Sequence, residues 1–164
     1  KTKSMLLNYN QQLEYPTSIV KLNGDSIDNV QVFQYLGCKI KFDEPSTGNA
    51  EVELRIDASE SKFYELGKNF MNYKIKLHTR VKMLNSLVRS RLTYACQSWS
   101  ITRVQLNRLS STYCAMLRKM IKGGYRRKPH TWSFQLSNQD LLRIGNTEDI
   151  GDFVARQQRN YAAH

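Results

Sequence analysis

The stretch LHTRVKMLNSLVRSRLTYACQSW, residues 77–99, decides the fold class of this 164-residue chain. Its apolar positions recur every three or four residues, which is typical of one face of an α-helix. They are Val81, Leu84, Val88, Leu92 and Cys96. The same stretch holds Arg80, Lys82, Arg89 and Arg91 but no acidic residue. We therefore expect a helix with an apolar buried face and basic residues on its exposed side.

Helical spacing continues on both sides of this segment. Upstream, apolar residues between Val52 and Phe70 predict a helix for which Asn49 is the N-cap. Downstream, the pattern predicts a helix over about 103–122, ended by the glycine pair 123–124. Two shorter helices follow: Ser137 caps the first, and residues 147–150 open the last. These segments together predict a predominantly α-helical bundle.

Before Pro45 the sequence changes to short strand patterns separated by turn residues. Residues 18–22 and 30–42 are rich in β-branched and aromatic residues at alternating positions, and residues 3–7 add a further short strand. Between the first two, Asn23-Gly24-Asp25 predicts a tight hairpin turn. The fold class expected is therefore α+β: a small antiparallel β-sheet or hairpin remnant followed by the helical bundle.

Positive charge is concentrated in one block of the chain. From Leu66 to Gln139 there are 15 Lys and Arg and no Asp or Glu, whereas the remainder holds 10 basic and 14 acidic residues. Such a block repels itself unless something anionic lies against it. We expect a polyanion as partner, with nucleic acid first and an acidic membrane surface second. A merely solvated basic surface is the alternative.

The sequence shows none of the residue arrangements that catalysis requires. The basic block lacks the carboxylates that hold paired metal ions for nucleotidyl transfer, and no glycine-rich phosphate loop is present. The cysteines Cys38, Cys96 and Cys114 do not stand at zinc-ligand spacing from the histidines, so we expect free, buried or half-buried thiols in a reducing compartment. We expect no catalytic residue, metal site or cofactor within the chain. No apolar run is long enough to cross a bilayer, and no secretory signal opens the chain.

Six short stretches, in the same order, resemble the reverse transcriptases of non-long-terminal-repeat (LINE-type) retrotransposons. The first two resemble the end of the family's palm segment and its primer-grip hairpin. The next three resemble the start of its thumb and its second and third thumb helices, and the last resembles the motif that closes the domain. They are KTKSM (1–5), VFQYLG (32–37), ELRIDA (53–58), LTYACQSW (92–99), MLRKMI (116–121) and RQQRNYAAH (156–164). The last departs from the family in having Ala163 where Gly is usual.

The resemblance implies three parts: 1–45 as the end of a palm subdomain, 46–128 as a helical thumb and 129–164 as a C-terminal helical extension. In the first part Tyr35, Leu36 and Gly37 would form the primer-grip-like hairpin. The thumb would lie along an RNA–DNA hybrid and contact its phosphates and sugars. The basic residues expected at that contact are Arg80, Lys82, Arg89, Arg91, Arg108, Arg118, Lys119, Lys122, Arg126, Arg127 and Lys128.

By this interpretation the chain is a fragment of an RNA-directed DNA polymerase and is inactive alone. The aspartate pair of the family would precede residue 1. Because the chain opens without an initiator Met and stops while a helical pattern is still running, we expect both ends to be cuts through a longer protein. Activity would need the upstream palm and fingers of the same polypeptide and Mg²⁺. The location implied is intracellular, with nucleus and cytoplasm expected for the parent element. Two alternatives remain: a non-catalytic basic nucleic-acid-binding module, and a structural adaptor for an acidic protein partner.

Overall fold

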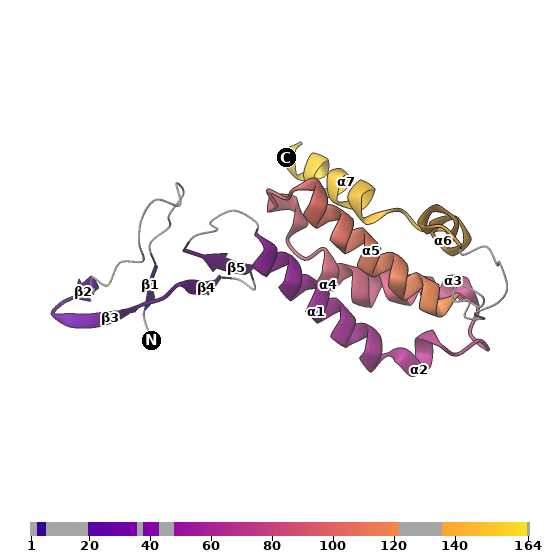
Figure 1. Ribbon diagram of the computed structural model, residues 1–164, viewed down its shortest axis with the longest axis horizontal. Coiled ribbons are helices and arrows are strands. Elements are labelled where there is room, and N and C mark those ends of the chain that lie inside the picture. Colours follow the sequence, from indigo (N-terminus) through magenta and orange to yellow (C-terminus); the bar gives the residue numbers. More distant parts are fainter. Residues whose placement is uncertain (1–2, 6–19, 36–37, 43–47, 122–135, 164) are drawn as a thin grey trace, which may run out of the picture. The chain divides into compact units, whose positions relative to one another are not determined.

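The computed structural model describes residues 3–5, 20–35, 38–42, 48–121 and 136–163. Short strands in the N-terminal part are followed by helices, so the α+β class is confirmed (Figure 1). The chain divides into two compact units. The sheet unit consists of Lys1–Leu54 with Trp99–Ile101, and the helical unit consists of Arg55–Ser98 with Thr102–His164.

Three strands of the sheet unit pair in the order β1-β3-β2. They are β1 (Lys3–Ser4), β2 (Val20–Leu22) and β3 (Asp25–Asn29). β2 and β3 are antiparallel, and the expected turn between them is confirmed: Asn23 and Gly24 have φ of 50° and 89°, the left-handed values that a two-residue hairpin of this kind needs. β1 instead pairs with β3 in parallel, so this three-stranded sheet is mixed. A parallel pair is possible here because no tight turn joins β1 to β3.

The second sheet is an antiparallel pair of β4 (Val32–Tyr35) and β5 (Cys38–Lys41). Tyr35 pairs with Cys38, so the connection between the strands consists of Leu36 and Gly37. These two residues and the side chain of Tyr35 lie outside the described part of the chain. The pairing of the primer-grip-like hairpin is thus observed, whereas the role expected of its three residues stays a prediction.

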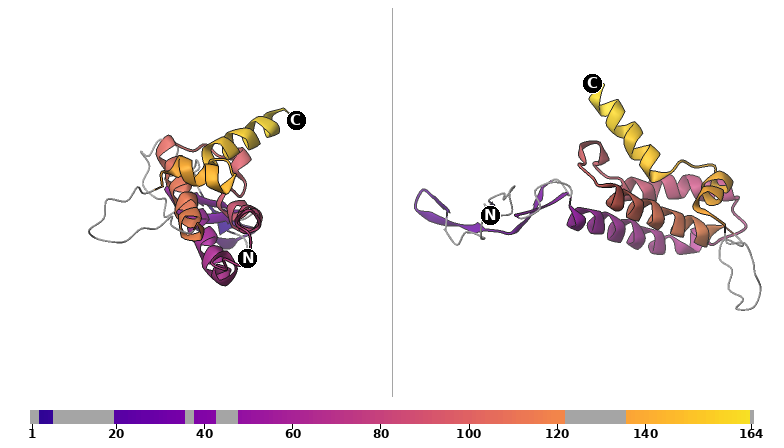
Figure 2. Two further views of the ribbon diagram at one scale, coloured as in Figure 1. Left: turned by 90° about the vertical axis from the view of Figure 1, so that its right-hand side faces the viewer. Right: turned by 45° about the horizontal axis from the view of Figure 1, so that its top comes forward.

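The helices pack around a core to which α5 contributes most. They are α1 (Asn49–Glu65), α2 (Gly67–Phe70), α3 (Leu77–Leu84), α4 (Ser90–Leu92), α5 (Arg103–Met120), α6 (Asn138–Gly145) and α7 (Ile150–Ala162). A π-helical turn, Asn85–Arg89, connects α3 to α4, and a 3₁₀ turn covers Cys96–Ser98. Both α6 and α7 pack against α5, and α6 lies at a steep angle to it (Figure 2).

The apolar face expected for residues 77–99 is confirmed by its burial. Val81, Leu84, Val88, Leu92 and Cys96 are all buried. Facing residues of α5 are equally buried, and these include Leu109, Tyr113, Leu117 and Met120. Because each large apolar side chain contributes roughly 1.5–3 kcal/mol when fully buried, this seam is a major source of stability in the helical unit.

The helix expected over residues 77–99 ends earlier, at Leu92. Thr93 donates its hydroxyl to the Arg89 carbonyl at 2.9 Å, and Ala95 adopts a positive φ of 60°. A side chain that bonds the backbone in this way competes with the regular helical ladder, and a left-handed residue cannot continue a right-handed helix. The chain therefore turns at residues 93–95 before the 3₁₀ turn.

The helix starts expected near Leu77 and Arg103 are confirmed, whereas that of α1 differs by one residue. Ser137 caps α6 as expected: its hydroxyl accepts the Asp140 N–H at 3.1 Å, and the Asp140 carboxylate accepts the Ser137 N–H in a capping box. Asn49 already belongs to α1, so the expectation that it is the N-cap is wrong, and the Gly48 carbonyl accepts the first helical N–H groups. The last helix opens within residues 147–150 as expected, and its cap is Asp149, whose carboxylate accepts the Gly151 N–H at 2.8 Å.

Replacing Ala95 with Gly should stabilise the protein. A left-handed conformation costs an L-residue about 1–2 kcal/mol, and the extra backbone entropy of Gly cancels part of the gain. We expect the Ala95→Gly variant to be more stable by about 0.5–1 kcal/mol in urea unfolding. Ala115→Gly, in the middle of α5, is the matched control and should cost about 1 kcal/mol. A decrease in the stability of Ala95→Gly would contradict the strained turn.

Candidate nucleic-acid interface

Seven of the eleven basic residues expected at a nucleic-acid contact lie in the described part of the helical unit. They are Arg80, Lys82, Arg89, Arg91, Arg108, Arg118 and Lys119. The other four lie outside the described residues and stay predictions, namely Lys122, Arg126, Arg127 and Lys128. The seven residues differ in their surroundings. Three are exposed, three are half-buried and bonded to neighbouring groups, and one is buried.

Lys82 and Arg91 are exposed on the segment formed by α3, the π-helical turn and α4. Within the described residues neither forms an ion pair. Between them Ser86 and Ser90 are also present, and both hydroxyls donate to carbonyls one turn earlier, at 3.0 and 2.7 Å. The segment thus combines exposed cations with small hydroxyl residues, the types that contact phosphate oxygens.

Arg91 faces the C-terminal part of α1. The pKa of Glu65 is lowered chiefly by a hydrogen bond from Lys62, at 2.6 Å, and in smaller part by the charge of Arg91. Glu65 is itself exposed and salt-bridged to Lys62, and such a surface pair is worth little. Arg91 therefore remains available for an external anion.

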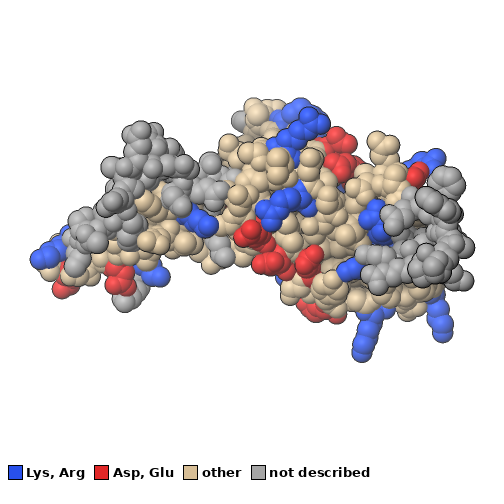
Figure 3. All heavy atoms as spheres, in the orientation of Figure 1, with Lys and Arg blue, Asp and Glu red and all other residues tan. Residues whose placement is uncertain are grey.

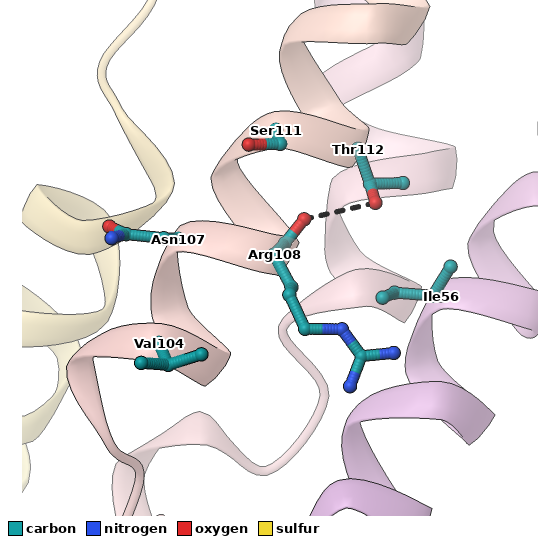
Figure 4. Close-up of a pocket in the computed structure, with 6 residues that line it drawn as sticks. All are labelled: Ile56, Val104, Asn107, Arg108, Ser111 and Thr112. Atoms are coloured by element: carbon teal, nitrogen blue, oxygen red, sulfur yellow. Dashed lines mark hydrogen bonds between the residues drawn. The ribbon is translucent and has the colours of Figure 1, made fainter.

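Arg108 is exposed on α5 and lines a shallow, open groove of about 530 Å³ between α5 and α1. Its guanidinium extends from α5 toward Ile56 on α1, while Thr112 donates its hydroxyl to the Arg108 carbonyl at 3.0 Å (Figure 4). Apart from Ile56 and Val104, the groove is lined by polar side chains. The groove is open to solvent and has one cation, so by itself it defines no specific ligand.

Arg118 and Lys119 are half-buried in the last turn of α5, and each has a neutral partner. Arg118 donates to the Leu136 carbonyl at 3.2 Å and to the Asn138 side chain at 3.0 Å, and so ties the end of α5 to the start of α6. Lys119 donates to the Tyr64 hydroxyl at 2.6 Å, with its ammonium 4.7 Å from the centroid of that ring. These contacts hold the side chains in place without placing a carboxylate against Arg118.

Arg89 belongs to a four-residue cluster that fastens α7 to the π-helical turn. Glu148 accepts hydrogen bonds from Arg89 at 3.4 Å and from Arg156 at 2.7 Å. Both guanidinium groups also lie over the Phe153 ring, at 4.4 and 5.1 Å from its centroid. The hydrogen bond with Glu148 raises the pKa of Arg156. Arg89 thus shares its charge with an internal carboxylate, which reduces what it offers to an outside anion.

Arg80 is 5% exposed, so the expectation that it lies on the basic exposed side is wrong. Its guanidinium donates to the carbonyls of Phe70 and Met120, both at 2.8 Å, and to that of Ile75 at 3.1 Å. Phe70 is the last residue of α2 and Met120 the last of α5. Carbonyls at helix C-termini lack partners in their own helix and carry partial negative charge, so a buried cation is favourable there.

A partly buried polar network close to this seam was not apparent from the sequence. The Tyr113 hydroxyl donates to the Asn85 side-chain carbonyl and lies 2.9 Å from the Thr147 hydroxyl, and the Asn85 amide donates to Thr147 at 3.2 Å. The three side chains come from α5, the π-helical turn and the connection between α6 and α7. Burial raises the pKa of Tyr113, so the hydroxyl stays protonated and able to donate. No local pattern in the sequence predicts that these three side chains are hydrogen-bonded to one another.

The charges on the surface are mixed rather than uniformly basic. Figure 3 shows Lys and Arg at several places on the visible face of the helical unit, with acidic side chains between some of them. Among the described residues, no group of three or more His, Cys, Asp and Glu could hold a metal ion. Nor does any helix within the described ranges have the length and apolarity to cross a membrane.

Arg80 and Lys82 should respond differently to substitution, although they are close neighbours in sequence. Arg80→Lys leaves buried carbonyls without donors, because an ammonium cannot reproduce the planar fork, and should lower the free energy of unfolding by about 1–3 kcal/mol. Lys82→Ala removes an exposed side chain and should change it by less than about 0.5 kcal/mol. Urea unfolding followed by circular dichroism measures both. Equal effects would contradict the structural role of Arg80.

The three cysteines are not joined in disulfides and should differ in reactivity. Burial raises the pKa of Cys96 and raises that of Cys114 to about 11, whereas Cys38 is partly exposed. Because the thiolate is the nucleophile, iodoacetamide at pH 8 should modify Cys38 first and reach Cys96 and Cys114 only after denaturation. Mass spectrometry of tryptic peptides identifies the sites. Early modification of Cys114 in the folded protein would contradict this order.

Comparison with known proteins adds no relative to this geometry. No protein-family model, curated protein or solved structure matches the chain. The candidate interface therefore depends on the chain's own residues: exposed Lys82, Arg91 and Arg108, and half-buried Arg118 and Lys119 held by neutral groups.

Proposed function

We propose that the helical unit binds nucleic acid along the phosphate backbone, as the thumb-like part of an RNA-directed DNA polymerase. One observation carries the proposal: residues 66–139 hold 15 cations and no acid, and the fold leaves Lys82, Arg91 and Arg108 exposed. Neutralising backbone phosphates releases counterions, and this supplies most of the affinity of non-specific nucleic-acid binding. The six stretches that resemble retrotransposon reverse transcriptases support the polymerase context.

The ligand that fits this proposal best is an RNA–DNA hybrid. A duplex with A-form character presents its phosphates and 2′-hydroxyls, so it is recognised by shape rather than by base edges. Exposed cations with neighbouring Ser86 and Ser90 on one helical segment suit such contacts. In this proposal other residues would carry out the bond-making step. Mg²⁺ and the carboxylates that bind it would belong to the upstream palm, and this unit would hold the duplex.

The proposal is tested by a salt titration of the full chain with three probes of one length. They are an RNA–DNA hybrid, a DNA duplex and a single-stranded RNA. We expect binding to the hybrid to be tightest, with a steep fall in affinity as salt increases. Equal, weak binding to all three probes would contradict the polymerase assignment and would favour an acidic protein as partner.

Charge reversal at Lys82 and Arg91 should weaken binding to all sequences of the hybrid alike. The double variant Lys82→Glu/Arg91→Glu should reduce the slope of log affinity against log salt by about one for each phosphate that the protein no longer neutralises. Lys3→Glu/Lys21→Glu is the matched control, because it makes the same change in net charge at exposed strand positions of the sheet unit. If both double variants weaken binding equally, net charge rather than this helical segment drives binding.

A further inference from the structure

A second groove of the helical unit lies between the turn after α4 and helix α7. Its volume is about 480 Å³, within the range of roughly 300–1,000 Å³ that small-ligand sites occupy. Tyr94, Ala95 and Gln97 line it from the turn, and Phe153 and Gln157 line it from α7. The hydrogen bond from the Gln158 side chain to the Cys96 carbonyl, at 3.3 Å, holds these two walls together.

Tyr94 presents an aromatic ring to this groove in a fixed position. The Arg55 guanidinium lies 4.6 Å from the ring centroid and Arg55 is itself buried, yet Tyr94 remains 48% exposed. The left-handed conformation of Ala95 turns the chain directly after this ring. A large aromatic side chain that contacts a cation and is still about half exposed can serve as a platform on which a planar group stacks.

The polar side chains that line the groove are those of Ser90, Thr93, Gln97 and Gln157. The two hydroxyls donate to the carbonyls of Ser86 and Arg89, at 2.7 and 2.9 Å, which leaves the two side-chain amides. Within the described residues, neither Gln97 nor Gln157 has a side-chain hydrogen-bond partner, although Gln157 is half-buried. Each amide offers one acceptor and two donor hydrogens. This is the combination that pairs with the hydrogen-bonding edge of a nucleobase.

Cations stand next to residues of both walls in the sequence. Arg91 is exposed three residues before Tyr94. Arg156 stands immediately before Gln157, but it donates to Glu148 at 2.7 Å, which reduces what it offers to an outside anion. An unpaired nucleotide has a flat base with polar edges and an anionic phosphate on either side. The groove residues match the base with a ring and amides, and Arg91 offers a cation for a phosphate.

We propose that this groove binds one unpaired nucleobase of a single-stranded segment that adjoins the duplex. Tyr94 stacks on the base, Gln97 and Gln157 bond its edge, and Arg91 contacts a neighbouring phosphate. An apolar peptide would leave both amides unpaired, which makes it the poorer occupant. This inference depends on the proposed function, since it adds a single-strand site to a unit that binds the duplex backbone.

The test compares a blunt RNA–DNA hybrid with the same hybrid carrying a short single-stranded overhang, at either end, on the full chain. We expect the overhang to tighten binding of the unmodified protein. Tyr94→Ala should abolish that gain, a reduction in affinity of roughly 5- to 100-fold for one stacked base, and should leave the affinity for the blunt hybrid unchanged. Tyr94→Phe keeps the ring and should retain the gain.

Two further variants separate the groove from general effects. Tyr161→Ala removes another exposed tyrosine of the helical unit, on α7, and should leave the overhang gain intact. Gln97→Ala/Gln157→Ala keeps the ring and should reduce discrimination among overhang bases. Photo-crosslinking from a halogenated uracil in the overhang should label Tyr94, which gives a readout independent of affinity.

The outcomes of these measurements are distinguishable. Binding to the blunt hybrid without any overhang gain would overturn the groove assignment while supporting the proposed function. An overhang gain that survives Tyr94→Ala, or that disappears equally in Tyr161→Ala, would also overturn it. Failure to bind any probe would overturn both proposals.

Discussion

Residues 66–139 hold 15 Lys and Arg and no Asp or Glu, so the helical unit has to fold against the mutual repulsion of these cations. Arg80 shows how this is achieved, because its guanidinium donates hydrogen bonds to three backbone carbonyls, two of them at helix C-termini. Arg118 similarly donates hydrogen bonds to the Leu136 carbonyl and the Asn138 side chain, and Lys119 donates to the Tyr64 hydroxyl. Hydrogen bonds and ring faces position the cations but do not neutralise them. The unit can therefore be well packed and still keep an excess of positive charge for a polyanion.

Helix α7 is held to this framework by two different kinds of contact. On one side Glu148, which lies outside the basic block, bonds Arg89 and Arg156, and both arginines lie over Phe153. On the other side, the hydrogen bonds among Tyr113, Asn85 and Thr147 fix the connection that leads into α7. A partly buried network of this kind favours one arrangement, because each partner left unpaired would cost free energy. The groove lined by Phe153 and Gln157 exists only if α7 is placed in this way.

The two proposals divide recognition between backbone and base. Lys82 and Arg91 lie on an exposed helical side without ion pairs within the described residues, which suits salt-sensitive contacts to phosphates. Tyr94 stands at the end of the same segment, where the helix has stopped and the chain turns. The helical part therefore offers cations on a regular framework, and the irregular part offers a ring and amides. Irregular backbone is well suited to the second task because it can direct side chains of several types into one groove.

The sequence by itself determined the features that depend on local periodicity and local chemistry. The apolar stripe from Val81 to Cys96, the turn at Asn23-Gly24 and the cap at Ser137 all follow from neighbours within a few residues, and the structure shows each of them. The concentration of positive charge is likewise a property of the sequence alone. Such features are predictable because helix period, turn geometry and capping are set by short-range forces.

Only the tertiary structure decided what the basic residues do. Arg80 and Lys82 are two residues apart, yet one is buried against the carbonyl of Met120, 40 residues away, and the other is exposed. Arg89 meets Glu148 across 59 residues, and Tyr94 and Gln157 line one groove from separate elements. The parallel pairing of β1 with β3 is also non-local. These contacts join positions far apart in the chain, so no local pattern could show which cation is covered, which is paired and which faces the solvent.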